Sequence, residues 1–295
     1  MSDDLLASIE TAPAPPEGAP GKREPTRAGR NLPVAIGVGV GLAALICVTL
    51  FSPARWSFVV VVAAAVGIGC YEIVKSLRTL GAQPTLVPLV VGGVATVVLA
   101  YLEGPDALFL GLVLTVLACL AWRLADPAEG FLRDVAASTF TAAYVPFLAG
   151  FAVLLAIPDD GPRRVATFIA VVVCSDVGGY AAGVLFGKHP MSPSVSPKKT
   201  WEGFAGSVLA CVVVGTVLFV TLFDVSPLLG AVFGLAVVLT ATLGDLGESM
   251  VKRDIGIKDM GTLLPGHGGI MDRLDSLLPT APVAYVLLAA FVSYP

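Results

Sequence analysis

The polar stretch of greatest chemical interest runs from Asp245 to Ser276 and reads DLGESMVKRDIGIKDMGTLLPGHGGIMDRLDS. It mixes acids and bases and lies between two apolar segments, 226–243 and 277–294. Charged groups are costly beside lipid and are usually kept there for function. Carboxylates suit a hard divalent cation, and clustered cations suit phosphate groups. The ionisable members of the stretch are Asp245, Glu248, Lys252, Arg253, Asp254, Lys258, Asp259, His267, Asp272, Arg273 and Asp275.

The first part of this stretch places several polar groups on one side of a predicted helix. We expect the preceding apolar segment to continue as a helix, in which positions i, i+3, i+4 and i+7 share a face. An ion pair between Glu248 and Lys252 at a solvated helix end would explain Glu248 without any function. It would not explain Asp245, one turn deeper. The residues at these four positions are Asp245, Glu248, Ser249 and Lys252.

A glycine-rich turn, PGHGG, follows and contains His267, Gly268 and Gly269. Glycines let a backbone turn tightly and approach a ligand, and consecutive N–H groups in such a turn can bind phosphate oxygens. By itself, such a turn is more often a plain loop. Asp272 and Asp275 come next, and acids at the start of a helix are also ordinary caps. The density of both charge signs, rather than any single residue, therefore indicates a functional site.

Another carboxylate lies in the middle of an apolar segment, in the sequence CSDVGGYAAGVLFGKH. Asp176 would be an ionisable group inside the membrane, which is costly and by default functional. Gly179, Gly183 and Gly187 recur every four residues. This spacing predicts a face of close helix packing, and Asp176 shares that face.

The loop after this segment ends in a cluster of cations. We expect its side chains to bind phosphate groups, although a basic loop can also be only a topology signal or a contact for anionic lipid. Trp201 would by itself be an interface anchor. The candidate residues of this loop are Lys198, Lys199, Thr200 and Glu202.

The composition is that of a membrane protein. Of 295 residues, 14% are charged and 56% hydrophobic, with a mean hydropathy of +0.87, whereas a soluble domain carries about 25% charged residues. Nine apolar segments come near the roughly 20 residues that cross a bilayer. We therefore predict an all-α polytopic integral membrane protein with about nine transmembrane helices. The segments are 33–52, 56–75, 85–102, 105–123, 134–157, 165–187, 203–223, 226–247 and 276–294.

The chain divides into three regions. Residues 1–32 are rich in Pro, Gly and charge and cannot bury enough apolar surface to order themselves, so we predict a disordered cytosolic tail. N-terminal transmembrane helices follow in 33–157. The C-terminal region, 158–295, is expected to be catalytic and to carry the long loops 188–202 and 248–275. The five cysteines all fall in apolar segments and suggest neither disulfides nor a metal site.

Lys and Arg placement predicts the orientation. If the N-terminus is cytosolic, fifteen Lys and Arg residues lie inside, and only Arg55, Arg163 and Arg164 lie outside. With an odd number of spans the C-terminus is then outside, and both long loops face the cytosol. We therefore expect a multi-pass protein of the cell (inner) membrane whose active site is on the cytosolic side.

Two segments resemble a known enzyme family. Residues 249–275, SMVKRDIGIKDMGTLLPGHGGIMDRLD, look like the signature of the phosphatidate cytidylyltransferase (CDP-diacylglycerol synthase) family. Residues 174–207 resemble its second well-marked region, and the first four spans resemble it only in hydropathy. The resemblance implies metal-dependent nucleotidyl transfer in phospholipid biosynthesis, in which CTP and phosphatidate give CDP-diacylglycerol and diphosphate.

The resemblance also implies roles for individual residues. Asp245 and Asp272 would hold Mg²⁺, with room for a potassium ion nearby. They would form the catalytic group together with Lys252 and Asp176. The family pattern usually has threonine after the intramembrane Ser-Asp, and Val177 here weakens any role for a hydroxyl at that position but not the role of the aspartate. Substrate binding would fall to Lys198, Lys199, Thr200, Glu202, Glu248, Ser249, Arg253, Lys258, Asp259, His267, Gly268, Gly269, Arg273 and Asp275.

The partners implied are CTP, phosphatidate, membrane lipid and a second copy of the chain as a homodimer, without nucleic acid. Three other readings stay open. One is a related enzyme, either an archaeal-type ether-lipid cytidylyltransferase or a CTP-using lipid-alcohol kinase. Another is a transporter whose Asp176 and Asp245 bind a coupling ion, although no internal repeat supports it. The last is a structural membrane anchor, which would not need these charges.

Overall fold

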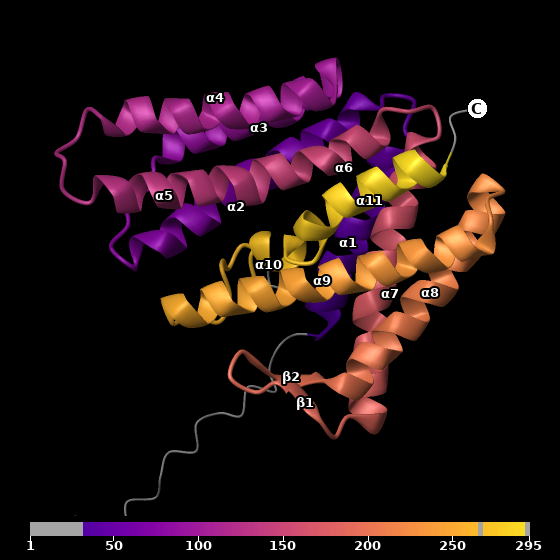
Figure 1. The fold of residues 1–295 in the computed structure, drawn as a ribbon. Coiled ribbons are helices and arrows are strands. Elements are labelled where there is room, and N and C mark those ends of the chain that lie inside the picture. The colour runs from indigo at the N-terminus through magenta and orange to yellow at the C-terminus, as the bar shows by residue number, and fades with distance from the viewer. Residues whose placement is uncertain (1–31, 265–267, 293–295) are drawn as a thin grey trace, which may run out of the picture.

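The computed structural model describes residues 32–264 and 268–292, with side chains from residue 37 onward. The chain is almost entirely helical (Figure 1). Its helices are α1 (Leu32–Leu50), α2 (Trp56–Arg78), α3 (Leu86–Glu103), α4 (Pro105–Arg123), α5 (Phe131–Ala142), the π-helix η1 (Ala143–Phe147), α6 (Leu148–Ala156), α7 (Gly161–Phe186), α8 (Trp201–Phe223), α9 (Pro227–Ile255), α10 (Met271–Leu274) and α11 (Leu277–Phe291).

Eight helical units of the described chain are long and apolar enough to cross a membrane. The apolar helix α1 precedes them, so each of the nine predicted segments falls on a helix or a run of helices. This confirms the prediction of an all-α polytopic membrane protein. The short turn predicted near Gly104 is also present, because α3 ends at Glu103 and α4 begins at Pro105.

The fifth span is one unit with a local change of helix type. It runs from Phe131 to Ala156 through α5, η1 and α6. Pro146 lies inside η1 and cannot donate a backbone hydrogen bond, so the chain widens into a π-turn there. Such turns are frequent at functional sites, and this one presents Tyr144 toward the polar groups described below.

One loop is more ordered than the sequence predicts. Residues 188–202 were expected as an irregular loop, but they contain strands β1 (Pro190–Ser192) and β2 (Ser196–Thr200), paired antiparallel. The three prolines and the serines of this segment hide the alternation that usually indicates a strand. The hairpin extends sideways from the lower ends of α7 and α8 (Figure 1).

The helices pack in two groups. In Figure 1, α2 to α6 lie roughly along one another, while α7 and α8 run side by side at an angle to them. Helix α9 packs on α8, and α11 packs against both α9 and α6, joining the two groups. Most buried side chains around these contacts are aliphatic or aromatic.

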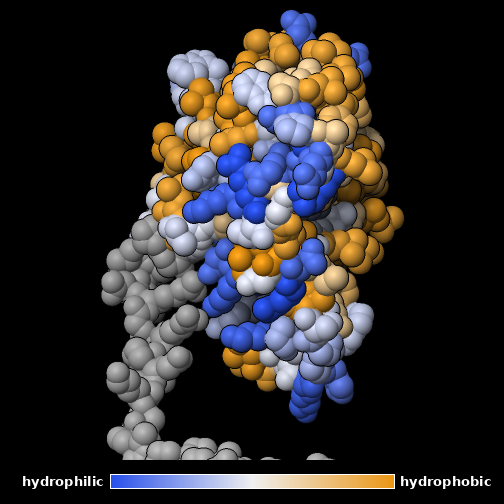
Figure 2. All heavy atoms as spheres, turned by 90° about the vertical axis from the view of Figure 1, so that its left-hand side faces the viewer, coloured by the Kyte–Doolittle hydropathy of each residue, from blue (hydrophilic) through white to orange (hydrophobic). Residues whose placement is uncertain are grey.

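The ends of the bundle differ in polarity. Figure 2 shows the end that lies at the left of Figure 1, where hydrophilic side chains gather in the middle of a largely hydrophobic outline. Among the described residues, the cations at the helix ends and loops on the α9 C-terminal side are Lys75, Arg78, Arg123, Arg133, Lys188, Lys198, Lys199, Lys252, Arg253, Lys258 and Arg273.

Candidate active site

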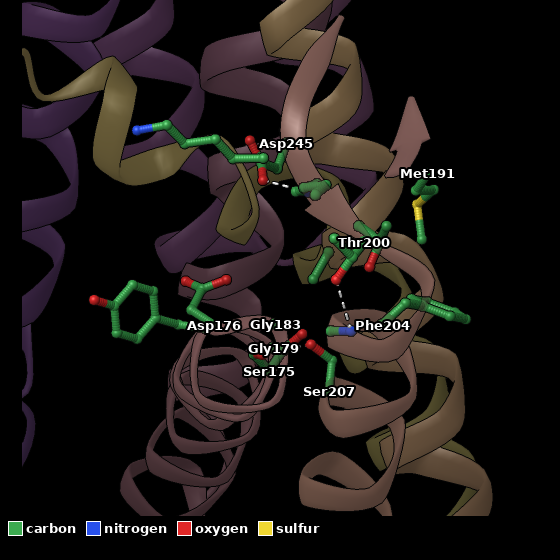
Figure 3. A pocket seen from close by; sticks show the side chains of 15 residues that line it. Ser175, Asp176, Gly179, Gly183, Met191, Thr200, Phe204, Ser207 and Asp245 are labelled. Carbon is green, nitrogen blue, oxygen red and sulfur yellow. Dashed lines mark hydrogen bonds and ion pairs between the residues drawn. The ribbon is translucent and has the colours of Figure 1, made fainter. Parts of the chain in front are cut away.

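A cavity of about 240 Å³ opens where α7, the hairpin, α8 and α9 meet. In Figure 3, Asp176, Asp245 and Thr200 come from three different elements and lie around one space. Lys199 Nζ pairs with Asp245 Oδ2, which ties the hairpin to α9. The cavity therefore combines carboxylates, cations and a hydroxyl. Its polar lining includes Ser175, Asp176, Lys198, Lys199, Thr200, Ser207 and Asp245.

Local sequence explains how the hairpin is held in front of this cavity. Thr200 caps α8 by accepting a 3.1 Å hydrogen bond from Gly203 N, so strand β2 runs directly into the helix. Glu202 accepts from the backbone N–H groups of Lys188 (3.1 Å) and His189 (3.2 Å) and also pairs with the His189 ring. Glu202 thus closes the base of the hairpin, and it is not among the residues that line the cavity.

The predicted glycine face packs α7 closely onto α8. A Cβ at Gly183 would lie 3.6 Å from Thr200 Oγ1, and one at Gly187 would lie 2.9 Å from the same atom. A Cβ at Gly179 would overlap Ser207 Oγ, which itself donates to Ser175 O at 2.6 Å. This confirms close packing as the role of the glycine repeat. The packing also sets Asp176 beside the hairpin lysines.

A second polar cluster lies next to the cavity and is built around Lys252. Its Nζ is 3.0 Å from Asp272 Oδ1 and 3.1 Å from Glu248 Oε1. The contact between Lys252 and Glu248 is an ion pair, and its geometry does not meet the requirements of a hydrogen bond. The side chains of Glu248 and Asp272 are only 1% and 4% exposed. Helix α9 continues to Ile255, so Asp245 and Lys252 lie on one helix face, as predicted. This shared face connects the cavity, which Asp245 lines, with the cluster around Lys252, and the two form one site.

Asp272 also organises the loop that precedes α10. Its Oδ2 accepts hydrogen bonds from Gly269 N at 2.8 Å and Met260 N at 2.9 Å, and its Oδ1 accepts from Met260 N at 3.1 Å. Gly268 has φ of +83°, and a Cβ there would lie 2.7 Å from Asp272 Oδ2. Glycine is therefore required at this turn both for its backbone angle and for its lack of a side chain.

The other predicted residues occupy several positions. Ser249 Oγ lies 3.5 Å from Asp245 Oδ1, and Arg253 Nε donates to Val195 O at 3.2 Å, which links α9 to the hairpin. Asp275 Oδ1 accepts from Ser276 N at 2.7 Å. His267 lies outside the described residues. Lys198, Lys258, Asp259 and Arg273 are exposed.

Two buried polar residues near the site were not predicted. Glu72 of α2 is 4% exposed and accepts hydrogen bonds from Ile270 N and Met271 N. Tyr144 has a buried hydroxyl without a hydrogen-bond partner, and neither oxygen of Glu248 accepts a hydrogen bond. The sequence did carry a signal for Glu72, since it is a carboxylate within a predicted apolar span, as Asp176 is. Tyr144 gave none, because tyrosine is common in membrane helices.

The carboxylates were also compared with the needs of a metal ion. Within residues 32–264 and 268–292, no three Asp, Glu, His or Cys side chains converge closely enough to hold a metal by themselves. Mg²⁺ commonly takes only one or two carboxylates and completes its shell with waters and substrate phosphates. Asp245 lines the cavity, and its Oδ1 has only a long 3.5 Å contact with Ser249. The donor set therefore fits Mg²⁺ bound together with a phosphate-bearing substrate.

A bundle of membrane-length helices, with lysines and carboxylates gathered in a cavity at one end, defines an enzyme of phosphate chemistry at a membrane surface. Comparison with known proteins identifies the family. The profile of the cytidylyltransferase family matches residues 33–291, and the chain belongs to that family.

Curated relatives cover nearly the whole chain. A phosphatidate cytidylyltransferase of Mycobacterium leprae is 48% identical over 280 residues, which are 89% of each chain. One of Mycobacterium tuberculosis strain H37Rv is 46% identical over 280 residues, 90% of this chain and 84% of its own length. The chloroplastic phosphatidate cytidylyltransferase 4 of Arabidopsis thaliana is 32% identical over 85% of this chain and 71% of its own.

Proposed function

We propose that this protein transfers a cytidylyl group from CTP to phosphatidate, giving CDP-diacylglycerol and diphosphate for phospholipid synthesis. Relatives that carry the name of this activity match most of the chain at 46–48% identity. The observation that carries the proposal is the convergence of Lys199 with Asp245, and of Lys252 with Asp272, from three segments, β2, α9 and α10, at one end of the bundle. Paired acids and bases of this kind suit the transfer of a charged phosphoryl group.

The reaction needs no covalent enzyme intermediate. A phosphate oxygen of phosphatidate attacks the α-phosphorus of CTP. The bond between the α-phosphorus and the oxygen that bridges it to the β-phosphate breaks, and diphosphate leaves. The protein contributes orientation and charge neutralisation. Lys198 and Lys199 lie at the cavity and would bind CTP phosphates, with Thr200 beside them. Lys252 would neutralise charge that develops on the transferred phosphorus or on the leaving group.

We propose Asp245 and Asp272 as the carboxylates that hold Mg²⁺. Asp245 faces the cavity, whereas Asp272 Oδ1 accepts a hydrogen bond from Lys252 Nζ. When bound, the ion would supply positive charge to the phosphate oxygens and fix their geometry. Asp176 lines the same cavity and would complete its polar wall. A potassium ion nearby stays a prediction, as do the substrate contacts of Lys258, Asp259 and Arg273.

The lipid substrate would enter from the side of α7. Beside Asp176 this helix exposes large side chains, with Val177 at 62% and Tyr180 at 76% exposure. An apolar surface next to a charged cavity lets acyl chains stay in the bilayer while the head group reaches the lysines. The site would face the cytosol at the cell membrane, where CTP is present. We also keep the prediction of a homodimer, which the mass of the purified protein in detergent would test.

A substrate assay with purified protein tests the proposal. Radiolabelled CTP is supplied with phosphatidate, an archaeal-type ether-lipid phosphate or a lipid alcohol, and the labelled product is identified. We expect label in CDP-diacylglycerol with phosphatidate, loss of turnover in EDTA and recovery with added Mg²⁺. Label transferred as phosphate to the lipid alcohol would identify a kinase instead. No turnover with any of these lipids would overturn the proposal.

A further inference from the structure

Glu72 connects α2 to the polar loop at the other end of the chain. Its Oε1 accepts from Ile270 N at 3.2 Å and its Oε2 from Met271 N at 2.8 Å, across 198 and 199 residues of sequence. One turn further along α2, Ser76 Oγ donates to Met260 O at 3.4 Å. One face of α2 therefore holds both sides of the loop between α9 and α10.

Two carboxylates from different elements bind this loop. Asp272 accepts from Met260 N and Gly269 N, while Glu72 accepts from the next two N–H groups, those of Ile270 and Met271. Three consecutive backbone N–H groups are thus directed at carboxylates. Hydrogen bonds to a charged acceptor are about twice as strong as neutral ones, so the orientation of this turn depends on both acids.

Glycines leave space for the Glu72 carboxylate. A Cβ at Gly261 would overlap Glu72 Oε1, and a Cβ at Gly269 would overlap Glu72 Oε2. The carboxylate is therefore enclosed between the two limbs of the loop. Any side chain at either glycine would push Glu72 and the loop apart.

The burial of Glu72 argues against a role in stability alone. Glu72 is 4% exposed, and taking a carboxylate out of water is expensive even when it is well hydrogen-bonded. A buried acid can often be replaced by well-packed apolar residues without loss of stability. The position is better explained by a need to fix the backbone beside Asp272.

We propose that Glu72 is a positioning residue for the transfer reaction, and this inference rests on the proposed function. Its two hydrogen bonds set the start of α10, and with it the carboxylate of Asp272 and the Lys252 ammonium paired to that carboxylate. Glu72 itself touches no reacting atom. A displacement of about 1 Å in such a group can lower a rate by 10²-fold.

The test compares Glu72→Gln and Glu72→Asp with the unmodified protein in detergent. Gln keeps the shape but places an amide N–H₂ against a backbone N–H, and Asp is one methylene too short. We expect kcat for CDP-diacylglycerol formation to fall by about 10- to 100-fold per folded molecule, with KM for CTP changed less than about threefold. Folded protein is counted from the monodisperse chromatographic peak.

The matched control is Asp134→Asn. Asp134 is another buried carboxylate, 2% exposed, that accepts a backbone hydrogen bond, from Gln83 N at 2.7 Å, and pairs with Arg123. It makes no contact with the α9–α10 loop among the interactions of the described residues. We expect this variant to lower thermal stability while leaving kcat per folded molecule unchanged.

A second pair of variants tests the same contact from the loop side. Gly261→Ala should reduce kcat because its Cβ displaces the carboxylate, and the additional loss should be smaller in a Glu72→Ala background, where that space is free. Additive losses would contradict the contact. If Glu72→Gln does not fold, Gly261→Ala alone decides, and an unchanged kcat overturns the inference. Failure of the unmodified protein to use CTP and phosphatidate would instead count against the proposed function.

Discussion

At the scale of single residues, Lys252 is the link between the two acids of the cluster. Its ammonium lies between Glu248 and Asp272, and the side chains of these acids are almost fully buried. Removing one partner of a buried ion pair costs about 3–5 kcal/mol, because the remaining charge is left uncompensated. The cluster therefore holds a cation in place before substrate arrives, and in the proposed function this cation neutralises charge on the transferred phosphate.

Asp272→Asn tests the acidic side of this arrangement. The amide keeps only one accepting oxygen, so either the bonds from Met260 N and Gly269 N to Oδ2 or the contact of Lys252 with Oδ1 is lost. We expect CDP-diacylglycerol formation to fall by at least about 10²-fold, the size of effect seen when a group that stabilises transition-state charge is removed. The measurement is turnover of labelled CTP by protein shown to be inserted and monodisperse.

The matched control for that variant is Asp106→Asn. Asp106 is an exposed acid in the first turn of α4, at the opposite end of the bundle from the site. Its replacement should leave turnover near that of the unmodified protein. An active Asp272→Asn enzyme would remove Asp272 from the catalytic group.

At the scale of elements, the site depends on how closely α7 and α8 approach. Gly178 and Gly206 face each other, and a Cβ at Gly206 would overlap Ala182 and lie 2.7 Å from Gly178 O. The hairpin between these helices carries Lys198 and Lys199. Small residues let membrane helices come together in this way, so the distance between Asp176 and the lysines is set by helix packing.

Gly206→Leu should separate the two helices. An inserted side chain that meets backbone atoms costs about 1–3 kcal/mol or more, so we expect a lower thermal midpoint. We also expect KM for CTP to rise by roughly 10-fold, about 1.4 kcal/mol of lost binding, because the cavity lysines move away from Asp176 and Asp245. Gly41→Leu in α1 is the control, since a Cβ there has no atom within 4 Å. Equal behaviour of the two variants would refute the dependence on α7–α8 packing.

At the scale of the whole molecule, charge is distributed unequally between the two ends. Among the Lys and Arg residues that the structure describes, only Arg55, Arg163 and Arg164 lie at the end opposite the site, and Arg164 there binds Asp160, Leu288 O and Val292 O. Lys and Arg are retained on the cytosolic side of membrane proteins. The distribution therefore predicts that the catalytic end faces the cytosol.

Cysteine labelling in cells measures this orientation. In a variant without the five native cysteines, single cysteines replace exposed Ser194 in the hairpin or exposed Glu103 at the end of α3. A membrane-impermeant maleimide should label Glu103→Cys in intact spheroplasts and label Ser194→Cys only after permeabilisation. The reverse pattern would place the site outside and contradict the predicted topology.

The sequence by itself determined the spans, the helical class, the close packing of the glycine face and the shared face of Asp245, Glu248 and Lys252. These are local properties, because hydropathy over about 20 residues and the spacing of side chains on one helix follow from the chain alone. The resemblance of residues 249–275 and 174–207 likewise predicted the family that the profile match then established.

Only the tertiary structure decided which distant groups meet. The pairing of Lys199 with Asp245 and the contact of Glu72 with Ile270 and Met271 join residues 46 to 199 positions apart. Such contacts depend on how the helices cross and on where the loops return. A sequence pattern does not encode this directly, because each helix buries its apolar side equally well against several possible neighbours.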